Sequence, residues 1–440
     1  MTMGPAMTMR YPLLLGGVLD FGNINKRCRE IMQQLRPGHQ LVLLQGGQAF
    51  FPSLVQAIDG SVHEVRMETY IFNVEASGLQ VALALERAAR RGVAVYLAMD
   101  GVGTPSLPSQ WSARFDAAGV QWAIFSPLGN LGMLIPSRWR RLHRKLCVVD
   151  GRVAFCGGIN VLDDFFDPNY GALETPRLDF AVRVTGPLVQ TMHEAMALFW
   201  WRLQVASTAR HSEFSASWRA LQEALALALQ ERLNTDGDGA DSPAIAQSHS
   251  TSAELVLRDN LRNRTRIERA YRKAIGTARE EILIANAYFL PGRKLRKGLI
   301  LAAERGVRVR LLLHGRYEYF MQYYATRPVY GALLAAGVEI YEYSAGFLHA
   351  KVAVIDGQWA TVGSSNLDPL SLLLAREANV VVDDAAFAQV LHARLEDAVL
   401  HGSVQIDPAA YANRPLRQRL LDALAFGLMR SLLFLYGKRY

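Results

Sequence analysis

The sequence predicts an α/β fold that is built twice from the same unit. Stretches that begin at Phe51 and at Glu268 follow the same order of helix, apolar strand, helix, apolar strand and apolar hairpin. Strand–helix–strand order favours parallel pairing within a sheet that is covered by helices. The 440 residues are enough for one large duplicated domain, and half of them are hydrophobic, as a packed core requires.

The first elements of the two halves match in order and in pattern. FPSLVQAIDGSVHEVRMETYIF from Phe51 aligns with ERAYRKAIGTAREEILIANAYF from Glu268, and both indicate a helix and then a buried strand ending in an aromatic pair. VALALERAARRGVAVYLAMDG from Val81 aligns with KGLILAAERGVRVRLLLHG from Lys297. Both combine a helical period with Arg-Gly-Val, an apolar strand and a closing glycine.

Each half then ends in an apolar hairpin. The hairpin sequences are HRKLCVVDGRVAFCGGIN from His143 and HAKVAVIDGQWATVGSSN from His349. Asp-Gly between two apolar runs is a strong hairpin signal. The two-residue period of a strand places His143 and Lys145 on one face, and His349 and Lys351 likewise.

The hairpins bring an imidazole, an ammonium and a carboxamide together twice. With Asp-Gly as the turn, His143 is expected opposite about Gly158, and His349 opposite about Ser364. The carboxamides beside them are Asn160 and Asn366. Lysine and asparagine can donate to the non-bridging oxygens of a phosphodiester, and histidine can attack phosphorus or protonate a leaving alcohol. Two such sets related by a pseudo-twofold axis would supply both tasks at one site, without a metal.

The acidic residues divide into two groups. Asp150 and Asp356 follow their histidines by seven residues, at the turns, and an extended chain of that length covers ~23 Å. We therefore interpret them as residues that cap the turns or pair with a base. The carboxylates that orient the histidines are expected farther along, at Asp179 in the first half and Glu377 in the second.

Charge and composition restrict the partners. The net charge of +8 and the sequence pI near 9.4 suit nucleic acid, a phospholipid surface or a phosphate ester, and the sign alone does not choose among them. Three cysteines without a Cys-x-x-Cys pair give no support to a disulfide framework or a zinc site. No run reaches the ~18 apolar residues of a membrane span, and the short apolar stretch 12–19 is interpreted as neither signal peptide nor anchor.

The composition divides the chain into five segments. They are an N-terminal extension (1–45), the first half (46–205), a helix with a flexible linker (206–252), the second half (253–404) and a basic amphipathic tail (405–440). In the tail, leucines share one broad helical face opposite Arg419, Asp422 and Arg430. These leucines are Leu416, Leu420, Leu424, Leu428, Leu432 and Leu435. The tail is either an interfacial membrane helix or a helix docked on the domain.

A second segment also has the sequence pattern of a membrane-binding surface. The run LGMLIPSRWRRLHRK from Leu131 places apolar residues beside basic ones just before His143. This segment either binds an anionic bilayer or folds over its own domain.

The motif His-x-Lys-x4-Asp followed by Gly-x-x-Asn, present twice, resembles the paired signature of the phospholipase D superfamily. It comprises His143, Lys145, Asp150, Gly157, Asn160, His349, Lys351, Asp356, Gly363 and Asn366. The resemblance spans roughly residues 45 to 400. It implies two mixed β-sheets flanked by helices, one site, a phosphohistidine intermediate and no cofactor. It also implies that the histidines, lysines and aspartates of the motifs are catalytic, with His143 as the attacking histidine.

Within the superfamily, the chain resembles bacterial cardiolipin synthases of the short type. METYIF from Met67, DGVGTPSL from Asp100, YFLPGRKL from Tyr288 and VGSSNLDPLSLLLAREANV from Val362 support this resemblance. Gly-Gly-Ile-Asn in the first half replaces the Gly-Ser-Ser-Asn of the second, so only Ser364 could donate a serine hydroxyl to phosphate. Asp179, Glu377 and the two asparagines complete the expected substrate-binding set.

The resemblance also implies a reaction and a location. The expected reaction transfers a phosphatidyl group from phosphatidylglycerol to a second lipid alcohol and releases glycerol; the acceptor is phosphatidylglycerol in the expected reaction, with phosphatidylethanolamine as the alternative. It would take place peripherally at an anionic membrane, on the cytoplasmic face, with no nucleic-acid partner. A phospholipase or nuclease using the same hairpins is the alternative enzyme. A non-catalytic membrane-binding protein is a third reading, although that class usually has a broken motif, and both motifs are intact here.

Overall fold

The computed structural model describes residues 35–129, 136–208, 251–259, 263, 265–315, 320–368 and 375–435. The apolar stretch 12–19, the apolar run 131–135 and most of the expected linker lie outside these residues. What was predicted for them is therefore neither confirmed nor contradicted.

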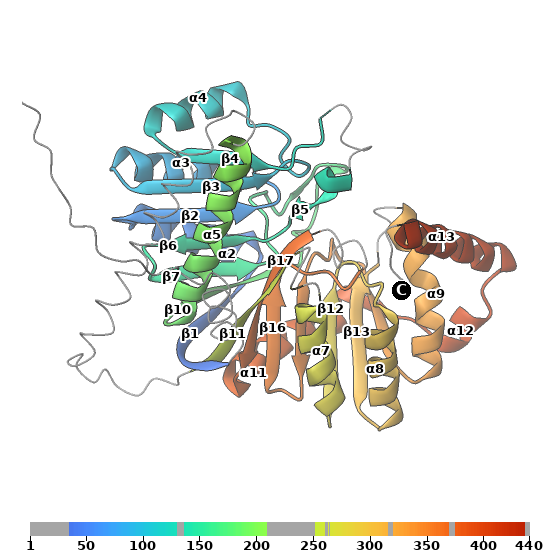
Figure 1. Cartoon of the computed structure of the whole chain (residues 1–440). Helices are drawn as coiled ribbons and strands as arrows, with labels where there is room; N and C mark the ends of the chain where they lie inside the picture. The colour runs from blue at the N-terminus through green and yellow to red at the C-terminus, as the bar shows by residue number, and fades with distance from the viewer. Residues whose placement is uncertain are drawn as a thin grey trace, which may run out of the picture.

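Apart from the separate β8–β9 pair, the strands of the described residues form one large mixed sheet in which the two halves repeat the same order (Figure 1). From the centre outwards, the first half contributes β1 (Arg36–Gln45), β10 (Phe180–Thr185), β7 (Val153–Gly157), β6 (Leu146–Val149), β2 (Glu64–Thr69), β3 (Ala94–Asp100) and β4 (Gln121–Phe125). The second half contributes β11 (Thr251–Arg258), β17 (Ala375–Asp383), β16 (Trp359–Gly363), β15 (Lys351–Ile355), β12 (Glu281–Asn286), β13 (Arg308–His314) and β14 (Glu339–Tyr343), with β18 (Ser403–Gln405) at the edge. The two series correspond strand for strand, which is the predicted pseudo-twofold duplication.

The pairing within each half is the mixed pattern that the sequence predicts. β2, β3 and β4 pair in parallel, as do β12, β13 and β14, and the remaining strands of the halves pair antiparallel. The glycine of each Arg-Gly-Val stands just after a helix with positive φ, at +91° for Gly92 and +87° for Gly306. That left-handed conformation ends the helix and turns the chain into the next strand.

β1 joins the two sheets into one. Its residues 40–45 pair with β10, and Arg36 and His39 pair with β11 of the second half. The predicted N-terminal extension of 45 residues is therefore too long, because residues 36–45 form a central strand. This strand precedes the repeat in sequence, so the comparison of repeats did not detect it.

Helices cover the sheet on both sides. The outer helices of the first half are α2 (Gly46–Asp59), α3 (Ala76–Arg90) and α4 (Ser109–Ala118). Those of the second half are α7 (Arg266–Thr277), α8 (Arg293–Glu304) and α9 (Phe320–Ala335). α5 (Leu188–Thr208) contacts β11 of the second half, and α11 (Ala385–Gly402) contacts β1 of the first. One apolar cluster therefore contains side chains from both halves, and this shared core holds the halves together.

The remaining elements are short or lie at the C-terminus. They are η2 (Pro136–Trp139), β5 (Arg141–Leu142), the β8–β9 pair (Phe166–Asp167 and Gly171–Ala172), α12 (Pro408–Ala412) and α13 (Leu416–Leu435). Among the described residues, no helix combines the length and the apolar character that crossing a bilayer requires.

Both hairpins form at the predicted Asp-Gly turns. Asp150 and Gly151 have φ of +51° and +61°, and Asp356 and Gly357 have +51° and +59°. Two successive positive φ values are typical of a type I′ turn. The registers pair Leu146 with Cys156 and Val352 with Val362. When these registers are continued past the strand ends, His143 lies opposite the residue after Gly158, and His349 lies opposite the residue after Ser364. Both positions are one residue beyond the expected ones.

Candidate active site

His143 is held by a glutamate from the other half of the molecule. β5 pairs in parallel with β17, and the His143 N–H donates to the carbonyl of Arg376 over 3.0 Å. The next residue on β17 is Glu377, whose two carboxylate oxygens lie 3.0 and 3.1 Å from His143 Nδ1. The backbone pairing and the side-chain contact therefore position the ring together.

His349 has the equivalent arrangement with the halves exchanged. Its N–H donates to the carbonyl of Leu178 over 2.9 Å, and Asp179 Oδ2 lies 2.6 Å from His349 Nδ1. Asp179 and Glu377, which were predicted to orient the histidines, each lie within hydrogen-bonding distance of a histidine Nδ1. The predicted pairing within each half is wrong, because each carboxylate contacts the histidine of the opposite half. The exchange depends on how the two sheets dock, which strand periodicity within one half does not describe.

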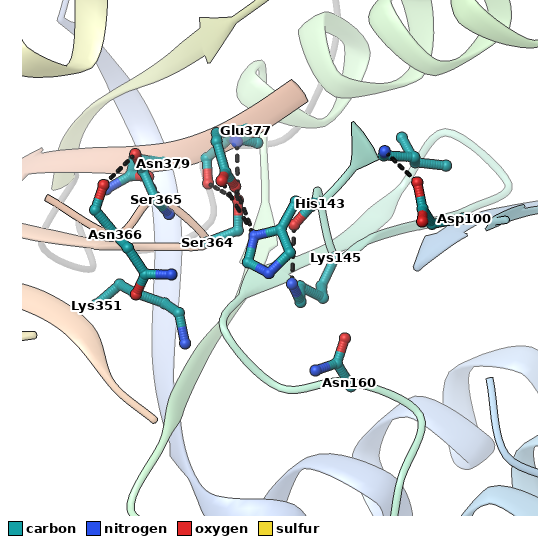
Figure 2. A network of polar contacts seen from close by, with 12 residues as sticks. Asp100, His143, Lys145, Asn160, Lys351, Ser364, Ser365, Asn366, Glu377 and Asn379 are labelled. Carbon is teal, nitrogen blue, oxygen red and sulfur yellow. Dashed lines mark hydrogen bonds and ion pairs between the residues drawn. The ribbon is translucent and has the colours of Figure 1, made fainter. Parts of the chain in front are cut away.

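The crossed pairs bring both motifs into one site. Lys351 lies close enough to affect the pKa of His143, and Lys145 and His143 both affect the pKa of His349. Figure 2 shows the amino groups of Lys145 and Lys351 and the amide of Asn160 around the space beside the His143 ring. When Nδ1–H is donated to a carboxylate, Nε2 is left as the lone-pair nitrogen, which is the atom that a nucleophilic histidine needs.

Burial favours the neutral form of both imidazoles. It lowers the pKa of His143, against the opposing effect of Glu377. Burial, followed by the charges of Lys351 and Lys145, holds the pKa of His349 well below its ordinary value. Burial also raises the pKa of Asp179 to about 6. The Asp179 carboxyl group of this pair can therefore hold a proton near that pH.

The side chains of the two lysines are buried at the centre of the site. Lys145 Nζ donates to the His143 carbonyl over 2.9 Å, and Lys351 Nζ donates to the His349 carbonyl. Burial lowers the pKa of Lys145 to about 7. A bound anion would restore the charged form of such a lysine, so the site favours a negatively charged ligand.

Ser364 supports the glutamate rather than facing the ligand. Its hydroxyl donates to Glu377 Oε2 over 2.5 Å and accepts the Ala378 N–H over 3.0 Å. The side chain is completely buried. The expectation that Ser364 donates to phosphate is therefore corrected, because its proton is already directed to the carboxylate that holds His143.

The first half supports its carboxylate without a serine. Gly158 and Asp179 occupy the positions that correspond to Ser364 and Glu377, and the Phe180 N–H donates directly to Asp179 Oδ1 over 2.8 Å. A Cβ on Gly158 would lie 2.2 Å from that same oxygen. The shorter aspartate therefore fills the space of the serine. This explains why the two Gly-x-x-Asn motifs differ.

The asparagines border the site. Asn160 Oδ1 accepts the Ile71 N–H over 3.3 Å, and its amide nitrogen is turned toward the lysines (Figure 2). Asn366 is buried beside Ser365. Their positions remain compatible with the predicted role of donors to a phosphate.

Asp150 and Asp356 lie at the far ends of the hairpins. Asp150 accepts the N–H groups of Val62, His63 and Glu64 over 2.8–2.9 Å. Asp356 accepts those of residues 279, 280 and 281, each over 2.9 Å. These contacts support the turn-capping interpretation. The catalytic role that the resemblance gave them is corrected, because each carboxylate is bound to the start of β2 or β12, away from the histidines.

A buried ion cluster behind His143 escaped the sequence reasoning. Arg144 Nε lies 3.0 Å from Glu68 Oε2, and both side chains are buried. Arg376 also acts on Glu68, and burial lowers the Arg376 pKa to about 10. Arg144 and Arg376 adjoin His143 and Glu377 in sequence, so the cluster links the two segments that carry this crossed pair. The sequence signal for this cluster was the presence of arginines directly beside the motif residues, at Arg144 and Arg376, next to apolar strands.

Asp100 holds the short strand before His143. Its carboxylate accepts the Leu142 N–H over 2.7 Å and pairs with Arg141 over 3.1 Å. In the sequence, Asp100 stands out only as the first residue of the resembling segment DGVGTPSL, and its contacts with β5 come from the structure. Among the described residues, no cluster of histidine, cysteine and acidic side chains has the arrangement of a metal site.

The duplicated sheet and the two crossed histidine–carboxylate pairs define a phospholipase D-type fold and site. The "Cardiolipin synthase, PLD-like domain" family matches residues 54–173 and 271–399. The chain is 35% identical to cardiolipin synthase B of Salmonella typhi over 402 residues, which are 91% of this chain and 90% of that protein. The chain therefore belongs to the phospholipase D-like cardiolipin synthase family and is an enzyme of that family.

Two further comparisons agree. Cardiolipin synthase B of Escherichia coli strain K12 is 34% identical over 411 residues, which cover 91% of this chain and 90% of that protein. The crystal structure of phosphatidylserine synthase from Haemophilus influenzae Rd KW20 superimposes with a TM-score of 0.64 over 93% of this chain and 99% of that one. At 14% sequence identity, this second likeness shows the fold alone.

Proposed function

We propose that this protein is a cardiolipin synthase that transfers a phosphatidyl group between two phosphatidylglycerol molecules through a phosphohistidine. The observation that supports the proposal most directly is the convergence of two histidines, each oriented at Nδ1 by a carboxylate from the opposite half. Nε2 of both rings is thereby available at a single site that also contains two buried lysines.

The first half-reaction breaks the bond to glycerol. His143 Nε2 attacks phosphorus, a P–N bond forms, and the P–O bond to the glycerol head group breaks. His349 gives its Nε2 proton to the departing oxygen, so glycerol leaves as the neutral alcohol. The raised pKa of Asp179 suits this task, because a proton on the His349–Asp179 pair is available near neutral pH.

The second half-reaction reverses these steps with a different alcohol. His349 takes the proton from a hydroxyl of the second phosphatidylglycerol, whose oxygen attacks phosphorus as the P–N bond breaks. Lys145, Lys351, Asn160 and Asn366 would donate to the non-bridging oxygens throughout. Transfer in place of hydrolysis requires that the acceptor lipid, and not water, reaches the intermediate.

We also place the enzyme peripherally at an anionic bilayer, on its cytoplasmic face. Within the described chain, Cys147 and Cys156 are buried thiols, as expected in a reducing compartment. Protease protection of the protein in inside-out and right-side-out membrane vesicles would test the assignment of the face.

The decisive experiment is product analysis with purified protein and phosphatidylglycerol vesicles. Cardiolipin and glycerol in equal amounts are expected. Phosphatidic acid as the main product would indicate a phospholipase, and cleavage of an oligonucleotide in place of lipid would indicate a nuclease. Either result would refute the proposed transfer. Peptide mapping of the labelled histidine, after rapid denaturation, would test the assignment of the attack to His143.

A further inference from the structure

Helix α13 packs on the domain with Asp422 and Ala425 turned inward. Asp422 is only 4% exposed and forms an ion pair with Arg414 at 2.9 Å, while Ala425 is also 4% exposed. The helix packs against α9. An ordinary amphipathic helix on a globular protein buries its leucines, whereas the leucines of α13 whose side chains the structure describes lie on the outside.

The opposite side of α13 presents a row of leucines to solvent. Leu416, Leu420, Leu424 and Leu428 are 70%, 56%, 69% and 55% exposed, and a spacing of four residues aligns them along one face. Leu421, 42% exposed, widens the row. A contiguous apolar surface of this kind on a folded protein marks an interaction site.

We propose that this leucine face lies in the interface of an anionic phospholipid bilayer. The inference rests on the proposed function in that the substrate is itself a membrane lipid. It goes beyond that function by assigning the face of the protein that docks. The helix would lie parallel to the membrane plane, with the leucines among the acyl chains and the Asp422 side held by the protein.

Charge favours a bilayer over a second copy of the chain as the occupant. From Arg414 to the end of the sequence, six basic residues stand against a single acidic residue, Asp422. The basic residues are Arg414, Arg417, Arg419, Arg430, Lys438 and Arg439. Two such tails would repel one another across a symmetric contact, whereas anionic head groups attract basic residues beside an apolar face.

The location of α13 fits delivery of lipid to the site. Figure 1 shows α13 across the upper end of α9, at the same end of the second half as the meeting of β5 and β17. His143 follows β5 and Glu377 lies on β17. Docking through α13 would therefore turn the end of the domain that contains the site toward the head groups.

The test measures co-sedimentation of the full chain with vesicles, comparing mixed phosphatidylglycerol and phosphatidylcholine with phosphatidylcholine alone. Leu424→Glu should weaken binding to the anionic vesicles about tenfold, and Leu420→Glu combined with Leu424→Glu about a hundredfold. Gln418→Glu adds the same charge to the exposed start of the helix, away from the leucine row, and should change binding less than threefold. Binding to phosphatidylcholine alone should be weaker than to the anionic mixture.

Several results would overturn the proposal. One is equal binding by the double variant and the unchanged chain. Another is a lipid-free dimer that Leu424→Glu converts to a monomer, because the face would then join two copies. If the glutamates lower the melting temperature, the uncharged pair Leu420→Ser and Leu424→Ser applies the same test.

Docking is measured separately from turnover. His143→Ala should bind vesicles as the unchanged chain does while making no product. A failure of the proposed reaction, such as release of phosphatidic acid, would leave the binding result intact. A failure of the leucine variants to affect binding would leave the reaction intact.

Discussion

Replacing Ser364 with alanine tests the support behind His143. The hydroxyl is the donor to Glu377 Oε2 at 2.5 Å, in a fully buried position that water does not reach. Alanine removes this donor and also the acceptor of the Ala378 N–H, while the carboxylate remains buried. A hydrogen bond to a charged group contributes about 1.5–3 kcal/mol.

The expected effect on catalysis follows from that free energy. If the loss falls on the orientation of His143, about 1.5–3 kcal/mol corresponds to a fall in kcat of roughly tenfold to a hundredfold. KM should change little, because Ser364 does not face the ligand. Cardiolipin formation on phosphatidylglycerol vesicles gives kcat and KM, and thermal unfolding establishes that the variant is folded.

The chain supplies a matched control in the adjacent residue. Ser365 is equally buried, but its hydroxyl donates to the Asn366 carbonyl over 3.3 Å and does not contact Glu377. Ser365→Ala should retain activity within about threefold, since a neutral hydrogen bond contributes about 0.5–1.5 kcal/mol to stability and none of it acts on the histidine. Equal kcat values for the two alanine variants would refute the role given to Ser364.

Three further predictions follow from the same geometry. His143→Ala and His349→Ala should each abolish cardiolipin formation with melting temperatures close to that of the unchanged chain; residual turnover above about one part in a thousand in either would contradict a two-histidine mechanism. Asp150→Asn should destabilise the fold by about 1–3 kcal/mol in urea unfolding while activity per folded molecule is retained, because its carboxylate accepts three backbone N–H groups. Burial opposes ionisation of Asp150, but these donors hold its pKa below the ordinary value. The stabilisation by Asp150 should therefore be present at neutral pH and be lost in acid, as the pH falls through the folded-state pKa. Loss of activity by Asp150→Asn at unchanged stability would refute the turn-capping role. Lys145→Met should abolish activity yet raise the melting temperature most at pH 7 and below, because burial lowers the lysine pKa to about 7 from 10.5. Between those values the unfolded chain binds the extra proton, so the unchanged protein gains about 1.4 kcal/mol of stability per pH unit as pH rises, and the advantage of methionine should shrink toward pH 10; a pH-independent difference would contradict the buried lysine.

The repeat made most of the fold predictable. Local patterns repeated in the same order identify the helices, the parallel strands and the two Asp-Gly hairpins, because these depend on residues close in sequence. β1 was missed as a structural element because its role, joining β10 to β11, comes from contacts with strands far away in the chain.

The composition of the site was also largely present in the sequence. The paired histidines and lysines, the asparagines and both orienting carboxylates could be named, since strand alternation fixes which residues share a face. The docking of the two halves decided the rest. It alone determines that Glu377 meets His143 and Asp179 meets His349, that Ser364 faces Glu377, and that Asp422 of α13 turns inward while the leucines face outward. Sequence periodicity determines the faces of an element, but the partner of each face depends on long-range packing, which only the tertiary structure specifies.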